Sequence, residues 1–278
     1  MAAGKRRLGA EVMSLDYERQ FAAFFDELAD AARPIALHYF RKNLVVDDKE
    51  DKTPVTQADR EIEQKLRELI KKKFPSHGII GEEYGGENSE AEFVWVIDPI
   101  DGTKGFATGC PTFGTIIGLA HNGKPVIGLV DQAFTKERWF GVHEVFCRYN
   151  GVLVKVTVPR ALSAARLYTT SPEMFEGGYE ASFDTLCHAV KWARFSADCY
   201  AYGLLALGWV DLVIERQMKV PDLIGLVPII SGAGGFVSDW QGREITLVNN
   251  GTIVAASDKK LAEEALAVIN REKSEDAA

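Results

Sequence analysis

The first periodic segment of the chain, residues 14–43, repeats apolar residues every three or four positions. The repeated residues are Phe21, Phe24, Phe25, Leu28, Ala32 and Ile35. This spacing predicts one helix with a buried face, either long or kinked because Pro34 fits poorly inside it. A second helix is predicted from Pro54 to Phe74, because proline suits a first turn and the apolar residues again form one stripe. That stripe comprises Ile62, Leu66, Leu69 and Ile70.

Short runs rich in β-branched and aromatic residues follow. They predict strands at 93–98, 115–121, 125–132 and 138–143. Asn122-Gly123 between two of these runs indicates a hairpin. From residue 151 the pattern alternates between strands and helices. The predicted strands are 152–158, 166–171, 194–198, 211–216, 235–240 and 252–257, and the predicted helices are 172–190, 199–208, 222–232 and 259–271. This change of pattern predicts two subdomains, residues 1–150 and 151–278.

The amino-acid composition limits the kinds of function that the chain can have. The 278 residues are 46% hydrophobic and 26% charged, with a formal net charge of −8 and a pI of about 5.3. This balance disfavours a nucleic-acid-binding surface, although an acidic protein can bind a phosphorylated substrate through metal ions. The four cysteines show no CxxC spacing, and no apolar run has the length of a signal peptide or membrane span. Reduced thiols, a cytoplasmic location and no membrane partner are therefore expected.

The candidate chemistry begins in WVIDPIDGTKGF, residues 95–106. Apolar residues predict a buried strand that ends at Asp98, where a carboxylate must be paired, hydrogen-bonded or metal-bound. Pro99 disfavours helix at Asp98, so the chain turns and can bring Asp101 beside it. A divalent cation would relieve the repulsion between the two carboxylates. The alternative is an ordinary strand-to-turn junction.

The residues after Asp101 suit a phosphate. If a helix begins near Thr103, the backbone amides of residues 102–104 point outward as an anion site. Oxygen ligands without His or Cys favour Mg²⁺, or Mn²⁺ in its place, over zinc. Glu82 follows another short apolar run, and it is either part of a solvated loop or a further ligand. Together these residues indicate metal-assisted hydrolysis of a phosphate ester.

Further acids lie at the ends of other predicted elements. Asp59 is near the start of the second helix, where the helix dipole favours a carboxylate. Asp222 opens an apolar helical run and could equally be a helix N-cap. Asp198 and Glu215 end two predicted strands of the second half. If these acids of the second half face the predicted metal site of the first half, a substrate cleft would lie between the two halves. Taken singly, each of these acids is more often a surface residue.

At this point the chain resembles the inositol monophosphatase superfamily of Mg²⁺-dependent, lithium-sensitive phosphatases. The matching segments, in family order, are PVTQADREIE (54–63), GIIGEEYG (78–85), WVIDPIDGTKGF (95–106) and PDLIGLVPIISGAGG (221–235). The resemblance implies an αβαβα layered sandwich with mixed sheets, of the sugar-phosphatase type, and a homodimer. It also implies a small phosphate monoester as substrate and no nucleic-acid partner.

The resemblance implies a role for each matching residue. The implied ligands of two Mg²⁺ ions are Glu82, Asp98, Asp101, Asp222 and the backbone carbonyl of Ile100, and Asp59 would bind a third, weaker ion. Glu82, Asp59 and Thr103 are the implied catalytic residues: Asp59 polarises Thr103, whose hydroxyl orients the attacking water. The amides of Gly102 and Thr103 would hold the phosphate, and a water near Asp222 would protonate the leaving alkoxide.

Within the superfamily, the sequence around these motifs is most similar to that of the histidinol-phosphate phosphatases, above all in SADCYAYGLLALGWVDLVIE (196–215). A substrate amine needs acid partners, which Asp198 and Glu215 could supply. The implied reaction is therefore hydrolysis of L-histidinol phosphate in histidine biosynthesis. The alternatives are an inositol phosphatase, a phosphatase of another sugar or nucleotide phosphate, and an inactive regulatory homologue. Pro221 and Ser231 depart from the family pattern, which leaves specificity and rate open.

Overall fold

The computed structural model describes the backbone of residues 2–42, 46–48 and 54–271, and the side chains of residues 16–42 and 56–271. The helices are α1 (Ala2–Tyr39), α2 (Gln57–Lys73), α3 (Thr103–Ala107), α4 (Glu180–Ala189), α5 (Asp198–Ala206), α6 (Val220–Ile224), α7 (Leu226–Gly232) and α8 (Lys259–Ile269), with short 3₁₀ turns η1 (Leu162–Ala164) and η2 (Pro172–Phe175). The strands are β1 (Val46–Asp48), β2 (Pro54–Thr56), β3 (Gly78–Gly81), β4 (Gly85–Glu87), β5 (Phe93–Asp101), β6 (Gly114–His121), β7 (Lys124–Gln132), β8 (Glu137–Val142), β9 (Phe146–Tyr149), β10 (Val152–Val154), β11 (Arg166–Thr169), β12 (Trp192–Phe195), β13 (Leu212–Arg216), β14 (Phe236–Ser238) and β15 (Thr252–Ala256).

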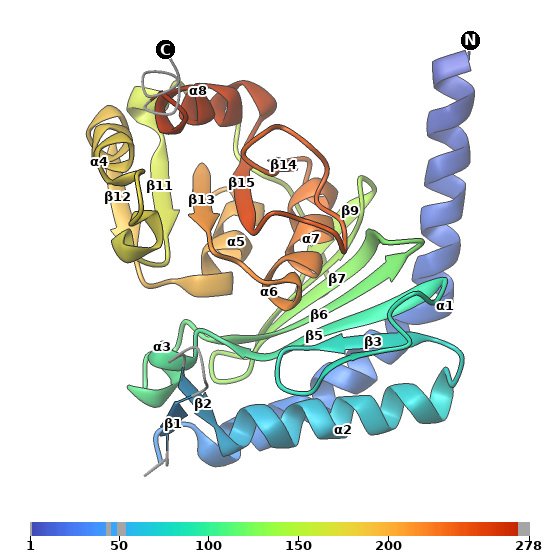
Figure 1. The fold of residues 1–278 in the computed structure, drawn as a ribbon. Helices are drawn as coiled ribbons and strands as arrows, with labels where there is room; N and C mark the ends of the chain where they lie inside the picture. The colour runs from blue at the N-terminus through green and yellow to red at the C-terminus, as the bar shows by residue number, and fades with distance from the viewer. Residues whose placement is uncertain (1, 43–45, 49–53, 272–278) are drawn as a thin grey trace.

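These elements form five layers (Figure 1). One sheet has eight strands in the order β10-β9-β8-β7-β6-β5-β3-β4, and a second has five in the order β12-β11-β13-β15-β14. Helices α1 and α2 cover one face of the eight-stranded sheet, and α5, α6 and α7 lie between the two sheets. Helices α4 and α8 cover the far face of the five-stranded sheet. The expected αβαβα layered fold with mixed sheets is confirmed.

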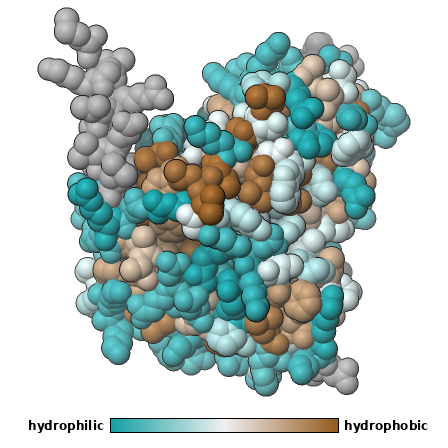
Figure 2. Space-filling view, turned by 180° about the vertical axis from the view of Figure 1, so that it is seen from behind, coloured by the Kyte–Doolittle hydropathy of each residue, from teal (hydrophilic) through white to brown (hydrophobic). Residues whose placement is uncertain are grey.

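The alternation of side chains along β5 explains this layering. Trp95 and Ile97 pack into the core formed with α1 and α2, whereas Val94 and Val96 pack into the core formed with α5 to α7. Successive side chains of a strand point to opposite faces, so an apolar strand of this kind requires cover on both sides. A third core lies between the five-stranded sheet and helices α4 and α8. The surface seen from behind is mostly polar, with apolar side chains gathered in its upper middle (Figure 2).

A row of glycines brings helix backbone directly onto the eight-stranded sheet. Gly118 of β6 pairs with Gly128 of β7, which pairs in turn with Gly141 of β8. A Cβ atom on Gly128 would lie 1.9 Å from the carbonyl oxygen of Gly225, and one on Gly141 would lie 2.5 Å from that of Pro228. Only glycine permits such close approach of two backbones. This glycine row therefore fixes the junction of α6 and α7 against the sheet.

Helix α1 is attached to the sheet by ion pairs as well as by its apolar face. Asp131 of β7 is buried and accepts hydrogen bonds from Arg33 at 2.5 and 3.0 Å and from Arg138 at 2.7 Å. Arg138 also reaches Asp26 at 2.8 Å and Asp30 at 2.6 Å, both on α1. The helix continues through Pro34 to Tyr39, so the expectation of one long helix is confirmed, with an earlier end than residue 43.

Several predicted boundaries were wrong. The strand predicted at 152–158 ends at Val154, and the one predicted at 194–198 ends at Phe195, so Asp198 begins helix α5 instead of ending a strand. Pro54 lies in strand β2, paired with β1, and helix α2 begins at Gln57 because Thr56 is its N-cap. The predicted helix 172–190 is broken between η2 and α4 by Gly177 and Gly178, which have φ values of 90° and 103°. The predicted helix 222–232 is divided at residue 225. The division of the chain at residue 150 stays a prediction. None of the described helices is long and apolar enough to cross a membrane.

Candidate active site

Two parallel strands bring the first acids to one edge of the eight-stranded sheet. Strand β3 pairs with β5 in parallel, Gly81 opposite Ile97. Glu82 follows β3 at once, and its N–H donates to the Ile97 carbonyl at 3.1 Å. Asp98 and Asp101 lie at the end of β5, where the register with β6 shifts. Because parallel strands end on the same edge, Glu82, Asp98 and Asp101 are neighbours there, and their proposed roles stay predictions.

Two more acids enter this edge as the third residues of helices. Asp59 of α2 accepts hydrogen bonds from the N–H of Thr56 at 2.9 Å and from its hydroxyl at 2.6 Å. Asp222 of α6 accepts one from the N–H of Lys219 at 2.7 Å. Both carboxylates thus close the first turn of a helix, an arrangement that holds them in place. The N-cap role considered for Asp222 is wrong by three positions, since Lys219 is the N-cap.

The electrostatics show that these acids share one environment. Burial raises the pKa of Asp98 well above its usual range, and the charges of Glu82, Asp101, Asp222 and Asp59 raise it further. Burial likewise raises the pKa of Asp59 to about 6 against the lowering effect of its bonds to Thr56. Carboxylates this close to one another are stable in their ionised form only if a cation neutralises them. We refer to these five residues as the acid cluster.

The donor chemistry of the acid cluster fits a hard divalent cation. Its side chains offer carboxylate oxygens, the ligands preferred by Mg²⁺. The Oδ1 atom of Asp59 is buried and has no hydrogen-bond partner among the described residues, which is costly unless a ligand satisfies it. Within the described ranges, no group of three or more His, Cys, Asp or Glu side chains is already arranged to hold a metal ion.

The turn after Asp101 has the conformation that its glycine predicts. Gly102 has a φ of 81°, a left-handed value that glycine adopts without strain. Thr103 then opens α3, and its hydroxyl donates to the Ile100 carbonyl at 3.1 Å. A carbonyl oxygen has two lone pairs, so the same atom of Ile100 can still take a second partner. The implied roles of Gly102, Thr103 and Ile100 stay predictions.

Asp198 lies directly over this turn. A Cβ on Gly102 would be 2.9 Å from the Oδ2 atom of Asp198, which sets the distance between the two elements. Asp198 opens α5 with a φ of 46°, and the next N–H, that of Cys199, donates to the Asp101 carboxylate. Burial raises the pKa of Asp198 to about 6, and Lys104 acts in the opposite direction. The structure thus brings Asp198 to the turn at Gly102 and Thr103, which is predicted to bind phosphate and is called the phosphate turn below.

Glu215 lies deeper, on β13, and is only 1% exposed. It accepts hydrogen bonds from the N–H and hydroxyl of Thr170, both at 2.7 Å, and from the Tyr202 hydroxyl at 2.7 Å. Burial raises its pKa to about 7, although these hydrogen bonds favour the charged form. Glu215 therefore already has partners within the protein, and its predicted contact with a substrate amine stays a prediction.

Sequence reasoning missed the cations of the site. Lys219 on α6 places its Nζ atom 4.0 Å from Oε1 of Glu82, across the boundary between the two halves. Lys104 follows Thr103 and acts on Asp198. A signal existed for both, because each lysine lies within three residues of a predicted site residue. We expect such cations to limit the repulsion within the acid cluster.

An αβαβα sandwich with acids gathered at the edge of its larger sheet is typical of phosphatases that act on small phosphate esters. The chain belongs to the inositol monophosphatase family, whose model matches residues 18–274. The match extends over both sheets and all the described helices apart from residues 2–17 of α1.

Individual relatives agree with this assignment. The chain is 42% identical to "Bifunctional phosphatase IMPL2, chloroplastic" of Arabidopsis thaliana over 266 residues, 92% of this chain and 77% of the relative. It is 33% identical to a histidinol-phosphatase of Chlorobaculum parvum, covering 82% of this chain and 89% of the relative. Among solved structures, an inositol monophosphatase from Zymomonas mobilis is 40% identical, with a TM-score of 0.83 over 91% of this chain and 98% of the other.

Proposed function

We propose that this chain is a Mg²⁺-dependent phosphomonoesterase whose preferred substrate is L-histidinol phosphate. The observation that carries the chemistry is the acid cluster, in which burial and the charges of the four other carboxylates raise the pKa of Asp98. The substrate is supported by relatives named histidinol-phosphatase and by an additional acid, Asp198, over the phosphate turn. A cytoplasmic homodimer, expected from the sequence, remains a prediction.

Each residue has a proposed part in the reaction. Glu82, Asp98, Asp101, Asp222 and the Ile100 carbonyl would hold two Mg²⁺ ions, and Asp59 a third. When bound, Mg²⁺ lowers the pKa of a water molecule and neutralises charge on the phosphoryl group.

The chain's own groups would position the reactants. The Thr103 hydroxyl, held near the Ile100 carbonyl, orients the attacking water. The N–H groups of Gly102 and Thr103 bind phosphate oxygens, for which the left-handed turn at Gly102 leaves room. Asp198 accepts a hydrogen bond from the substrate's ammonium group, at the side of the turn that faces α5. The water then displaces the alkoxide in line, with no covalent enzyme intermediate.

A second candidate substrate is inositol monophosphate or a related sugar phosphate. It is favoured by the 40% identity to the inositol monophosphatase from Zymomonas mobilis. Inositol carries hydroxyl groups and no ammonium group, so it gains less from a carboxylate at position 198. An inactive homologue is not favoured, because Glu82, Asp98, Asp101, Thr103 and Asp222 are all present.

Two variants test the proposal. Asp101→Asn should abolish turnover and the rise in melting temperature caused by Mg²⁺, while the exposed Asp184→Asn on α4 should change neither. Asp198→Asn should lower kcat/KM for histidinol phosphate about tenfold more than for inositol 1-phosphate, a difference of about 1.4 kcal/mol. Full activity of Asp101→Asn, or of the wild type in excess chelator, would refute the metal mechanism. Equal losses on both substrates would refute the amine contact.

A further inference from the structure

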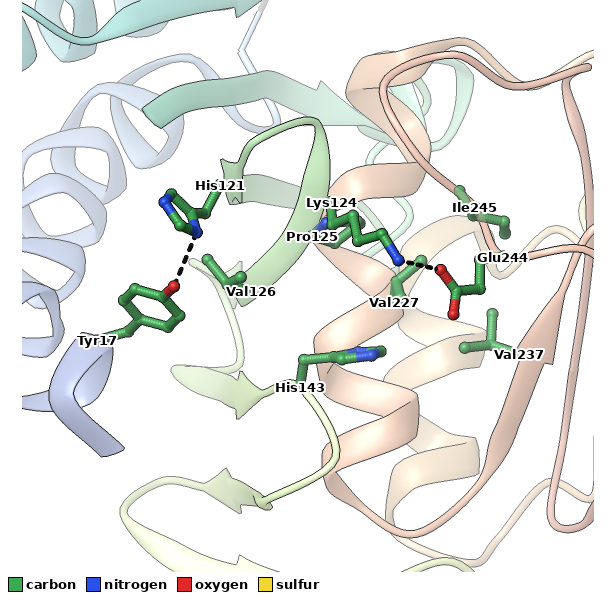
Figure 3. Close-up of a pocket in the computed structure, with 10 residues that line it drawn as sticks. All are labelled: Tyr17, His121, Lys124, Pro125, Val126, His143, Val227, Val237, Glu244 and Ile245. Carbon is green, nitrogen blue, oxygen red and sulfur yellow. Dashed lines mark hydrogen bonds and ion pairs between the residues drawn. The ribbon is translucent and has the colours of Figure 1, made fainter. Parts of the chain in front are cut away.

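A cavity of about 290 Å³ lies at the opposite end of the eight-stranded sheet from the acid cluster. It is formed by the β6–β7 hairpin, the residue after β8, helix α7 and the chain that follows β14 (Figure 3). Asp101 pairs with Gly114 at the start of β6, whereas the cavity begins at His121, seven residues later. At about 3.3 Å per residue the two places are about 23 Å apart. The cavity is therefore separate from the proposed active site.

Two opposite charges stand at the mouth of this cavity. The Nζ atom of Lys124 lies 2.7 Å from Oε2 of Glu244 (Figure 3), and the two side chains are 65% and 76% exposed. An exposed pair of this kind contributes little to stability, so separating it costs little. Both side chains can therefore reorient to bind a ligand, and their opposite charges give the cavity mouth no net charge.

The inner part of the cavity is apolar, with one hydrogen-bond acceptor. Val126, Val227 and Val237 line it. His143 contacts the Ser231 hydroxyl through Nδ1 at 2.8 Å, and that hydroxyl donates its single hydrogen to the Val227 carbonyl at 2.9 Å. In this arrangement Nδ1 of His143 is the donor to Ser231, which is one of the two tautomers that the contact allows. Burial lowers the pKa of His143, so its ring is neutral at pH 7 and Nε2 is an acceptor.

The second histidine of the lining is held by the protein itself. His121 contacts the Tyr17 hydroxyl through Nδ1 at 2.8 Å and Glu92 through Nε2 at 2.9 Å. Both ring nitrogens are therefore hydrogen-bonded within the protein, and His121 only lines one side of the cavity. The groups left for a ligand are one ammonium, one carboxylate, one neutral acceptor and an apolar surface.

The charges decide between classes of ligand. An anion would face Glu244 as well as Lys124, and a cation would face Lys124 as well as Glu244. A molecule that carries a positive and a negative group close together can replace the ion pair between Lys124 and Glu244 by two ion pairs, one with each of these side chains. A volume near the lower end of the range for small-molecule sites limits the ligand to a side chain about the size of an aromatic amino acid's beyond those charges.

We propose that this cavity binds a free α-amino acid with an apolar or aromatic side chain. Its carboxylate would bind Lys124, its ammonium group Glu244, and its side chain would pack on Val126, Val227 and Val237. A side chain with a ring N–H would in addition donate to Nε2 of His143. This site is independent of the proposed phosphatase activity.

Calorimetric titration with three compounds that share one aromatic ring tests the proposal. L-phenylalanine carries both charges, phenethylamine only the positive one and 3-phenylpropanoate only the negative one. We expect L-phenylalanine to bind at about 1 mM or below and each single-charge compound at least about tenfold more weakly. L-tryptophan, which has a ring N–H, should bind more tightly than L-phenylalanine.

Variants locate the binding. Lys124→Met should weaken L-phenylalanine binding about tenfold, whereas Lys259→Met on α8 should leave it unchanged. Both side chains are exposed and ion-paired, so both variants should keep the wild-type melting temperature and phosphatase activity. No binding of L-phenylalanine at about 10 mM, equal binding of all three compounds, or unchanged binding by Lys124→Met would each overturn the proposal.

Discussion

The burial of Glu215 predicts a specific dependence of stability on pH. Its pKa rises from an ordinary value of 4.5 to about 7 in the folded protein, chiefly because of burial. A carboxyl group whose pKa is higher in the folded state binds more protons there, so stability falls as pH rises between these two values. The difference between these two pKa values corresponds to about 3 kcal/mol of stability, which is lost in full above about pH 7.

The change Glu215→Gln removes this titration while preserving the shape of the side chain. Its amide oxygen can still accept from Thr170, and its amide group can donate to the Tyr202 hydroxyl. We expect similar unfolding free energies for wild type and variant at about pH 4.5, where Glu215 is protonated in the folded protein and about half protonated in the unfolded chain. By about pH 8 the variant should be more stable by about 2–3 kcal/mol.

Urea unfolding at several pH values, in chelator, measures this difference. Wild type and variant both contain Asp59 and Asp198, so subtracting the wild-type curve removes the titration of these two residues. The effect of the Asp198 charge on Glu215 is present only in the wild type. Glu263→Gln on the exposed face of α8 is the control and should show no trend. A difference between Glu215→Gln and wild type that stays constant across this range would refute the reasoning.

Two further predictions concern the framework of the fold. Gly128→Ala should destabilise the protein by about 3 kcal/mol, because the new Cβ would meet the Gly225 carbonyl. It should also weaken stabilisation by Mg²⁺, since the helix that carries Asp222 would be displaced. Unfolding in urea like that of the wild type would contradict this prediction. Arg138→Met should cost about 2 kcal/mol in the same assay, since Asp131 keeps Arg33 and the pairs with Asp26 and Asp30 are exposed. Its control, Arg19→Met in an exposed pair on α1, should stay within about 0.5 kcal/mol of wild type.

Local signals predicted much of the eight-stranded sheet. The runs at 93–98, 115–121, 125–132 and 138–143 all became strands within one to three residues, because strands buried on both faces are continuously apolar. Asn122 and Gly123 have φ values of 49° and 78°, as a tight hairpin turn requires. The acids of the site were also visible, since a carboxylate after an apolar strand has few structural explanations.

Features that depend on contacts between distant segments could not be predicted in this way. The break between α6 and α7 occurs at Gly225, where sheet backbone approaches; Pro228 in the first turn of α7 signals a helix start, but the approach comes from the distant strands β6 and β7. The hydrogen bonds of Glu215 come from Thr170 and Tyr202, which lie 45 and 13 residues away. Pro54 suits a first turn, yet its pairing with β1 and the capping by Thr56 displaced the helix start.

The glycine row has a consequence for attempts to change the substrate of this enzyme by engineering. Side chains can adopt new rotamers to absorb a substitution, whereas two backbones in contact have no such freedom. Libraries that vary the α6–α7 junction or the facing strands would therefore yield mostly misfolded variants. Asp198 at the start of α5 lies against the phosphate turn through its side chain, so the substrate site can be varied there by substitution without moving backbone. New specificity is best sought there, with the glycine row left intact.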